Sequence, residues 1–222
     1  MNNIKTRSGM LMTRGVMKMK TDPPSFVCSV RTFKHPTTNV TVSLHPIPNI
    51  ASRSFFNAMA EQVHLDPKFD IILCEDGRLP FVEGSAEARK AQISRTIFPI
   101  FSHRPVVPST CTKFEGLTTR DPAESRMAWM SVTQTMSPGV DPRARRAVER
   151  LESYPPGTRA VCPWNIYHNV YFSDKLAELG YELIEDREVV VIDQKQILGL
   201  VVMMFVVSML GGMFVVRTLF GM

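Results

Sequence analysis

Residues 197–216 decide the architecture of this chain, and they read Ile-Leu-Gly-Leu-Val-Val-Met-Met-Phe-Val-Val-Ser-Met-Leu-Gly-Gly-Met-Phe-Val-Val. The stretch carries no charged side chain, whereas Asp193 and Lys195 precede it and Arg217 follows it. A helix of this length spans about 30 Å, the thickness of a bilayer's hydrocarbon core. The alternative is a buried core helix, but such helices usually carry a polar stripe, and Ser208 is the one polar residue here. The sequence therefore predicts a transmembrane helix.

The surroundings of this segment predict how it sits in the membrane. The short tail 217–222 follows it, so we expect a tail anchor that inserts after synthesis. One lysine before it and one arginine after it leave its orientation open. Ser208 and Gly212 stand four residues apart and Gly211 lies beside them, which is a small-residue pattern that lets a neighbouring helix approach closely. We therefore expect a helix-packing partner at this face.

The N-terminal residues 1–24 form a basic leader. Five basic residues precede the first acid, Asp22, and equal the net charge of +5: Lys5, Arg7, Arg14, Lys18 and Lys20. The leader has no apolar core of a secretory signal, so it is typical of a mitochondrial address. The alternative is a disordered basic arm that touches anionic lipid or a partner. The rest of the chain is charge-balanced, and we expect no nucleic-acid partner.

The body predicts an α/β fold with a small mixed sheet, divided into a first half (25–93) and a second half (141–193). Strands are expected at 26–33, 40–44, 69–74, 159–162 and 181–192, with a hairpin turn at 36–39 and a kink near 185–186. Helices are expected at 52–64, from Asp141-Pro142 to 152, and from Ser173 to 179, where Gly180 ends the last one. Arg143 and the other charged residues of the 141–152 helix are assigned to its solvated face.

The segment 94–140 differs from both halves. Six prolines lie between residues 99 and 142, and no helical or strand period persists. Such a length without regular structure is unusual in a compact domain. Phe98, Phe101, Phe114 and Trp129 make it too apolar for a free linker. We expect an extended segment that is ordered by wrapping a partner, with a loose insertion as the alternative.

The four cysteines exclude two classes of small scaffold. Cys28, Cys74, Cys111 and Cys162 are far apart and form no Cys-x-x-Cys pair. That spacing fits neither a zinc ribbon nor a disulfide framework. Cys74 and Cys162 stand in apolar runs, so we expect both in the core.

Three polar residues follow predicted strand ends, where α/β folds place their sites. His45, Glu75 and His168 occupy these positions, and together they would suit a divalent metal that polarises a carbonyl and activates water. Asp76 and Arg78 could orient ligands or bind an oxyanion. The alternative is that each histidine is a surface or capping residue.

The order of these elements resembles the TraB/Tiki superfamily. The early block reads Asn39-Val-Thr-Val-Ser-Leu-His45, and the acidic strand reads Asp70-Ile-Ile-Leu-Cys-Glu75-Asp-Gly-Arg78. The late block reads Asn165-Ile-Tyr-His168 and then Leu176-Ala-Glu-Leu-Gly-Tyr-Glu182, so the likeness covers residues 36–80 and 158–192. The resemblance implies a metal-dependent, peptidase-like ancestry in which His45, Glu75, Arg78 and His168 are the candidate catalytic residues.

Two departures from the family pattern point away from catalysis. Val42 and Asn165 stand where the family has glycines that permit positive φ or close approach to a ligand. We therefore expect a degenerate site without a cofactor, in an accessory subunit of a mitochondrial membrane complex such as a respiratory or ATP-synthase assembly. The inner membrane is favoured over the outer. The alternatives are a membrane-anchored, metal-dependent hydrolase and an outer-membrane adaptor or tether.

Overall fold

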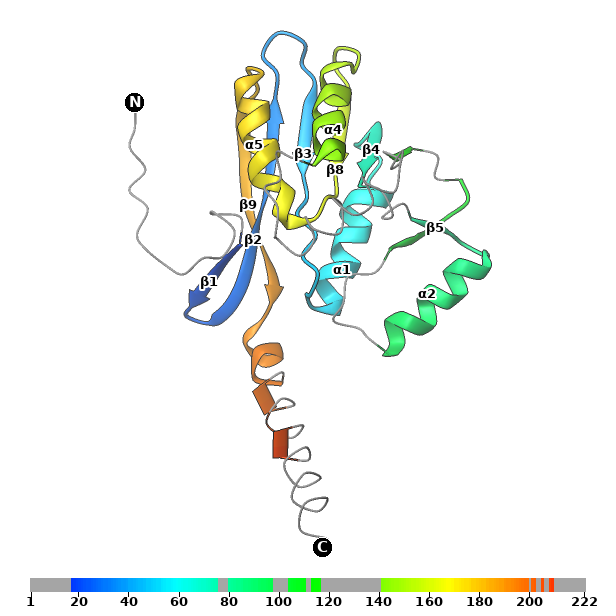
Figure 1. Ribbon diagram of the computed structural model, residues 1–222, viewed down its shortest axis with the longest axis vertical. Helices are drawn as coiled ribbons and strands as arrows, with labels where there is room; N and C mark the ends of the chain where they lie inside the picture. Colours follow the sequence, from blue (N-terminus) through cyan, green and yellow to red (C-terminus); the bar gives the residue numbers. More distant parts are fainter. Residues whose placement is uncertain are drawn as a thin grey trace, which may run out of the picture.

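Seven strands form one mixed sheet in the part of the chain that the structure describes (Figure 1). This computed structural model describes residues 17–75, 80–97, 104–110, 113–116, 141–199, 201–202, 205 and 208–209. The order is β1-β2-β3-β8-β4-β7, and β9 pairs with the other edge of β2. The bounds are β1 Met17–Thr21, β2 Pro24–Lys34, β3 Thr41–Leu44, β4 Ile71–Cys74, β7 Phe114–Gly116, β8 Arg159–Cys162 and β9 Glu182–Ile192.

The sheet combines an antiparallel part with a parallel part. β2 pairs antiparallel with β1, β3 and β9, and the hairpin predicted between β2 and β3 is confirmed. β3, β8, β4 and β7 run parallel, so their carboxyl ends meet at one edge. The register of β9 on β2 shifts twice, once between the partners of Thr32 and Phe33, which is the irregularity expected near residue 185. The predicted α/β class with a mixed sheet is therefore confirmed.

Helices cover both faces of this sheet. Ser52 caps α1 (Arg53–Ala60), which continues as a π-helical turn to Leu65. Asp141 caps α4 (Pro142–Glu152) as predicted, with proline in the first turn. α5 (Asn169–Glu178) begins four residues before Ser173, whose hydroxyl donates to the Asn169 carbonyl inside the helix. Gly180 adopts φ +85° and ends this helix, as the sequence indicates.

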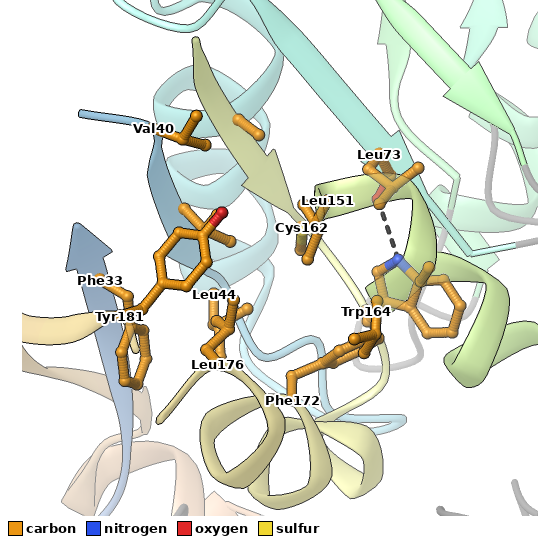
Figure 2. Close-up of a cluster of buried hydrophobic side chains, with 14 of the residues drawn as sticks. Phe33, Val40, Leu44, Leu73, Leu151, Cys162, Trp164, Phe172, Leu176 and Tyr181 are labelled. Carbon is orange, nitrogen blue, oxygen red and sulfur yellow. Dashed lines mark hydrogen bonds between the residues drawn. The ribbon is translucent and has the colours of Figure 1, made fainter. Parts of the chain in front are cut away.

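The two faces have separate apolar cores. On one face α4 and α5 pack against alternate residues of the sheet, and Figure 2 shows Leu44, Leu73 and Cys162 beside Trp164 and Phe172. On the other face α1 packs against the intervening residues, which are Cys28, Val30, Ile72, Cys74 and Val161. The fold is therefore a three-layer α/β/α sandwich in which neighbouring strand residues enter opposite cores.

The buried cysteines are core residues. Cys28, Cys74 and Cys162 are free thiols among the described residues, and the prediction that Cys74 and Cys162 fill the core is confirmed. Burial raises the pKa of Cys28 and of Cys74 to about 12. These thiols are therefore protonated packing groups at neutral pH.

The segment 94–140 contains regular structure that is not expected from its sequence. α2 (Ala86–Ile97) enters it, β6 (Val106–Val107) pairs with β5 (Phe81–Val82), and β7 joins the main sheet beside β4. The expected extended conformation is therefore wrong for residues 94–97, which are helical, whereas β6 and β7 are short extended strands. Residues 98–103, 111–112 and 117–140 lie outside the described residues, and the wrapping of a partner stays a prediction.

The sheet also takes in part of the predicted leader. β1 covers residues assigned to the segment 1–24, and it pairs with the first half of β2. Lys20 Nζ lies 2.6 Å from Glu188 Oε2, and Lys18 Nζ lies 3.5 Å from Glu188 Oε1 on β9. Two of the five basic residues of the leader therefore have partners in the fold, while residues 1–16 lie outside the described residues.

β9 runs directly into a C-terminal helix. The Asp193 side chain accepts from the Gln196 backbone N–H and the Gln196 side chain accepts from the Asp193 N–H, both at 2.9 Å, which is a reciprocal N-terminal cap. Residues 194–199, 201–202, 205 and 208–209 are helical, and Ser208 is exposed. None of the helices in the described residues has the length and apolarity that a membrane crossing requires. Gly211 and Gly212 lie outside those residues.

Candidate functional site

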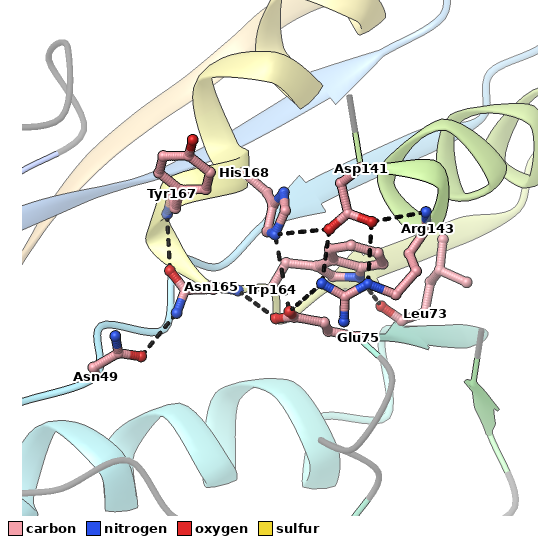
Figure 3. A network of polar contacts seen from close by, with 9 residues as sticks. All are labelled: Asn49, Leu73, Glu75, Asp141, Arg143, Trp164, Asn165, Tyr167 and His168. Atoms are coloured by element: carbon pink, nitrogen blue, oxygen red, sulfur yellow. Dashed lines mark hydrogen bonds and ion pairs between the residues drawn. The ribbon is translucent and has the colours of Figure 1, made fainter. Parts of the chain in front are cut away.

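A buried polar cluster lies where β4, β8 and α4 meet (Figure 3). Glu75 follows the end of β4, Asp141 caps α4, and His168 ends the 3-10 helix η4 (Ile166–His168) that follows β8. Glu75 is 2 % exposed, Asp141 is 0 % exposed and His168 is 1 % exposed. β4 and β8 run parallel and end at the same edge of the sheet, which brings Glu75 and His168 together there, and the first turn of α4 adds Asp141.

Arg143 lies at the centre of this cluster. Its Nε donates to Asp141 Oδ1 at 3.1 Å, and its Nη2 donates to Asp141 Oδ2 at 2.7 Å. The same Nη2 lies 3.4 Å from Glu75 Oε1. The guanidinium therefore lies between the two carboxylates and supplies the positive charge that both contact.

His168 lies beside both carboxylates. Its Nε2 is 3.7 Å from Asp141 Oδ2 and 3.9 Å from Glu75 Oε1. The Trp164 ring meets the imidazole edge to face at a centroid distance of 5.3 Å. The indole N–H of Trp164 in turn donates to the Leu73 carbonyl at 2.9 Å, which fixes that ring on the end of β4.

Asn165 connects the cluster to the loop after β3. Its backbone N–H donates to Glu75 Oε2 at 3.0 Å, and its side-chain amide donates to Asn49 Oδ1 at 2.8 Å. Its side-chain oxygen Oδ1 accepts from the Tyr167 backbone N–H at 3.0 Å and so caps η4. Glu75 is therefore held on one oxygen by a backbone amide and on the other by Arg143.

Opposing effects set the ionisation of Asp141. Burial alone would raise the pKa of this carboxyl, but the hydrogen bonds and the charge of Arg143 outweigh burial and hold the pKa below its usual range. The charge of His168 acts in the same direction. Asp141 is therefore an acceptor-only carboxylate at neutral pH.

His45 is not part of this cluster. Its Nδ1 lies 3.4 Å from Met59 Sδ, and its ring lies edge to face with Phe69 at 6.2 Å, among residues of the α1 core. Burial, followed by the charges of Arg187 and Lys68, lowers the pKa of His45 to about 3. The buried imidazole is therefore neutral.

Strand parity explains why the predicted set of His45, Glu75 and His168 does not converge. Leu44 and Leu73 face the α4/α5 core, so Glu75, two residues after Leu73, faces it as well. His45, one residue after Leu44, faces the α1 core instead. The convergence expected from the strand ends is therefore wrong for His45. Among the described residues, no group of three or more His, Cys, Asp or Glu side chains has an arrangement suited to a metal ion.

Two members of the cluster are not among the site residues predicted from the sequence. Asp141 was predicted as a helix cap only, and Arg143 was assigned to the solvated face of α4, although it is 3 % exposed. The spacing Asp141-Pro142-Arg143 is a local signal, since it places both side chains on the first turn of one helix. Asp76 and Arg78, predicted to orient ligands, lie outside the described residues.

The two positions that depart from the family pattern have structural roles. Val42 is a fully buried residue of β3, and Asn165 has φ −53°, so its backbone conformation does not require glycine. Comparisons of the chain with protein-family models, with curated proteins and with solved structures find no match. The likeness to the TraB/Tiki superfamily therefore stays a prediction from the sequence.

Proposed function

We propose that this chain is a non-catalytic accessory subunit of a mitochondrial membrane complex, such as a respiratory or ATP-synthase assembly, held at the bilayer by residues 197–216. The apolar surface of the C-terminal helix carries this proposal. Five large side chains there are more than half exposed: Leu198, Val201, Val202, Phe205 and Met209. Contiguous apolar surface of this kind is unfavourable in water, at about 25 cal/mol per Å², and marks contact with lipid or with a partner.

The buried cluster supports a structural role for the α/β domain. Arg143 neutralises charge from Asp141 and Glu75 and lies between their carboxylates. An ion pair of this kind is a packing element that specifies how α4 sits on the end of β4. The position of the Arg143 guanidinium between these carboxylates favours this structural role over the alternative of a metal-dependent hydrolase.

The mitochondrial assignment rests on the first sixteen residues. Lys5, Arg7 and Arg14 stand there without an acidic residue, even though Lys18 and Lys20 pair with Glu188. Residues 1–16 therefore still contain three basic residues and no acidic one, the composition that is typical of a mitochondrial address. The favoured membrane is the inner one.

Carbonate extraction of membranes tests the anchor. We expect the full chain to stay in the membrane pellet, because residues 197–216 are uncharged. A variant with Val202→Lys and Phe205→Lys should move to the supernatant, since charges at the centre of a membrane helix cost about 2.5–3.5 kcal/mol each. The matched control is Ile93→Lys with Ile97→Lys, two exposed apolar residues on α2, which should stay in the pellet. Release of the unmodified chain by carbonate would contradict the anchor.

Purification in mild detergent tests the complex. We expect the chain to co-purify with other membrane proteins in fixed ratio, and those partners to protect the segment 94–140 from protease. Recovery of a monodisperse monomer with that segment readily cleaved would rule out the accessory-subunit role while leaving the anchor intact.

A further inference from the structure

A second polar region lies between α1, α2 and the β5–β6 pair, away from the buried cluster. It is an open pocket of about 370 Å³. Three arginines line it, Arg53 from the first turn of α1 and Arg89 and Arg95 from α2, together with Glu83, Gln92 and the apolar Val106. Pockets of a few hundred Å³ are of the size that holds small ligands.

The charges in this pocket are unbalanced. Three arginines against one glutamate leave a net charge of +2 on the lining residues. Several other described arginines pair with carboxylates, for example Arg143 with Asp141 and Arg159 with Asp70. Within the described ranges, no ion pair joins any of the three pocket arginines to a carboxylate.

Arg95 shows the effect of this imbalance most directly. Its Nη2 donates to the Arg104 carbonyl at 2.9 Å, so its partner is a neutral backbone oxygen. Partial burial, followed by the charge of Arg53, lowers the pKa of Arg95. The two guanidiniums therefore repel each other across the pocket, and an anion between them would stabilise both.

We propose that this pocket binds a phosphate group. Guanidinium groups present paired N–H donors that match phosphate oxygens, and charge-assisted bonds of this kind are among the strong ones. The amide of Gln92 adds a neutral donor and acceptor beside them. The volume exceeds what a bare phosphate needs and leaves room for the organic part of a phosphate ester.

The location of the pocket allows two sources for that group. In Figure 1 the lower ends of α1 and α2 lie toward the side of the domain from which β9 continues into the C-terminal helix. A phospholipid headgroup could reach the pocket there, and so could a soluble phosphate ester. The site itself depends on the arginines alone and not on the proposed membrane role.

Calorimetric titration of the full chain in a non-ionic detergent tests the site. The two probes are inorganic phosphate and dihexanoyl phosphatidic acid, which carries the same group on a short lipid. Arg53→Gln and Arg95→Gln should each weaken binding roughly 10- to 100-fold, the loss expected for one charged hydrogen-bonding partner. Lys90→Gln is the matched control, because Lys90 is an exposed residue of α2 that does not line the pocket, and it should leave affinity unchanged.

Each outcome decides the proposal. Similar affinity for both probes supports a soluble phosphate ester, whereas clearly tighter binding of phosphatidic acid supports a lipid headgroup. Absence of heat and of a melting-temperature shift with either probe overturns the site, as does equal weakening by Lys90→Gln and Arg53→Gln. Arg53 is exposed, so Arg53→Gln remains folded and informative even if Arg95→Gln unfolds the pocket, and a thermal melt checks both variants.

Discussion

The two faces of the sheet surround a buried histidine differently, one with charged partners and the other with apolar side chains. On the face covered by α4 and α5, His168 lies within 4 Å of two carboxylates and shares them with Arg143. On the face covered by α1, His45 lies against Met59 and Phe69, where burial disfavours its charge. One core therefore accommodates charge through internal pairing, and the other excludes it. Whether a histidine at a strand end belongs to a polar site therefore depends on which face of the sheet it enters.

Of the changes considered, removal of Arg143 should lower the stability of the fold the most. Arg143→Met leaves Glu75 and Asp141 buried without their cation, and we expect a loss of about 3–5 kcal/mol in the free energy of unfolding. Arg145→Met on the exposed side of the same helix is the control and should change it by less than about 0.5 kcal/mol. Urea denaturation measures both variants. Equal stability of the two would mean that the cluster is not an ionic one.

Between pH 7 and pH 5, acid should destabilise the fold mainly through the buried histidines on the α1 face. Burial lowers the pKa of His45 to about 3 and that of His64 to about 4, below the unfolded value of about 6.5. Below pH 6.5 the unfolded chain therefore binds more protons than the folded chain, and the free energy of unfolding decreases as the pH is lowered. Between pH 7 and pH 5 each of these histidines should remove about 2 kcal/mol.

His45→Phe separates this effect from the other titrations. Phenylalanine keeps an edge-to-face contact with Phe69 but cannot take up a proton, so the loss between pH 7 and pH 5 should shrink by about 2 kcal/mol. His64→Phe should shrink it by a similar amount and serves as the matched variant. Denaturation curves at several pH values give both slopes. An unchanged slope in both variants would refute the neutral, buried state of these rings.

The smallest effect is expected where the charges face water. Lys20 pairs with Glu188 between β1 and β9, and both side chains are substantially exposed. Lys20→Gln should therefore cost less than about 1 kcal/mol, and added salt should reduce that difference further. Thermal melts at low and high ionic strength measure it, with Lys90→Gln as a control. If Lys20→Gln lowered the free energy of unfolding as much as Arg143→Met does, buried and exposed ion pairs would not differ in their contribution to stability.

The sequence predicted the elements well where their signals are local. The cap at Asp141, the stop at Gly180 and the continuous apolar strand before Glu75 each follow from a few neighbouring residues, and the structure has all three. β6 and β7 were missed because strands of two and three residues are too short to show a period.

The candidate site was only half predictable, for a physical reason. β3 and β4 are buried on both faces, so they have no polar side that would indicate which core each residue enters. Glu75 and His168 were therefore correctly expected at one sheet edge, while the direction of His45 depends on pairing with β8 across the sheet. Arg143 contacts Asp141 on the same helical turn, which the sequence could indicate, but its burial also depends on Glu75, which is distant in sequence, and a helical charge pattern does not indicate that contact.

The direct junction between β9 and the capped C-terminal helix has a mechanical consequence. β9 pairs with β2 from Phe26 to Lys34 along nearly its whole length, and no linker separates Ile192 from the cap at Asp193. Tension along the helix would load these ladder bonds together, in shear, instead of peeling them one after another. A pull from the C-terminal end should therefore be transmitted to the centre of the sheet before the edge strand detaches.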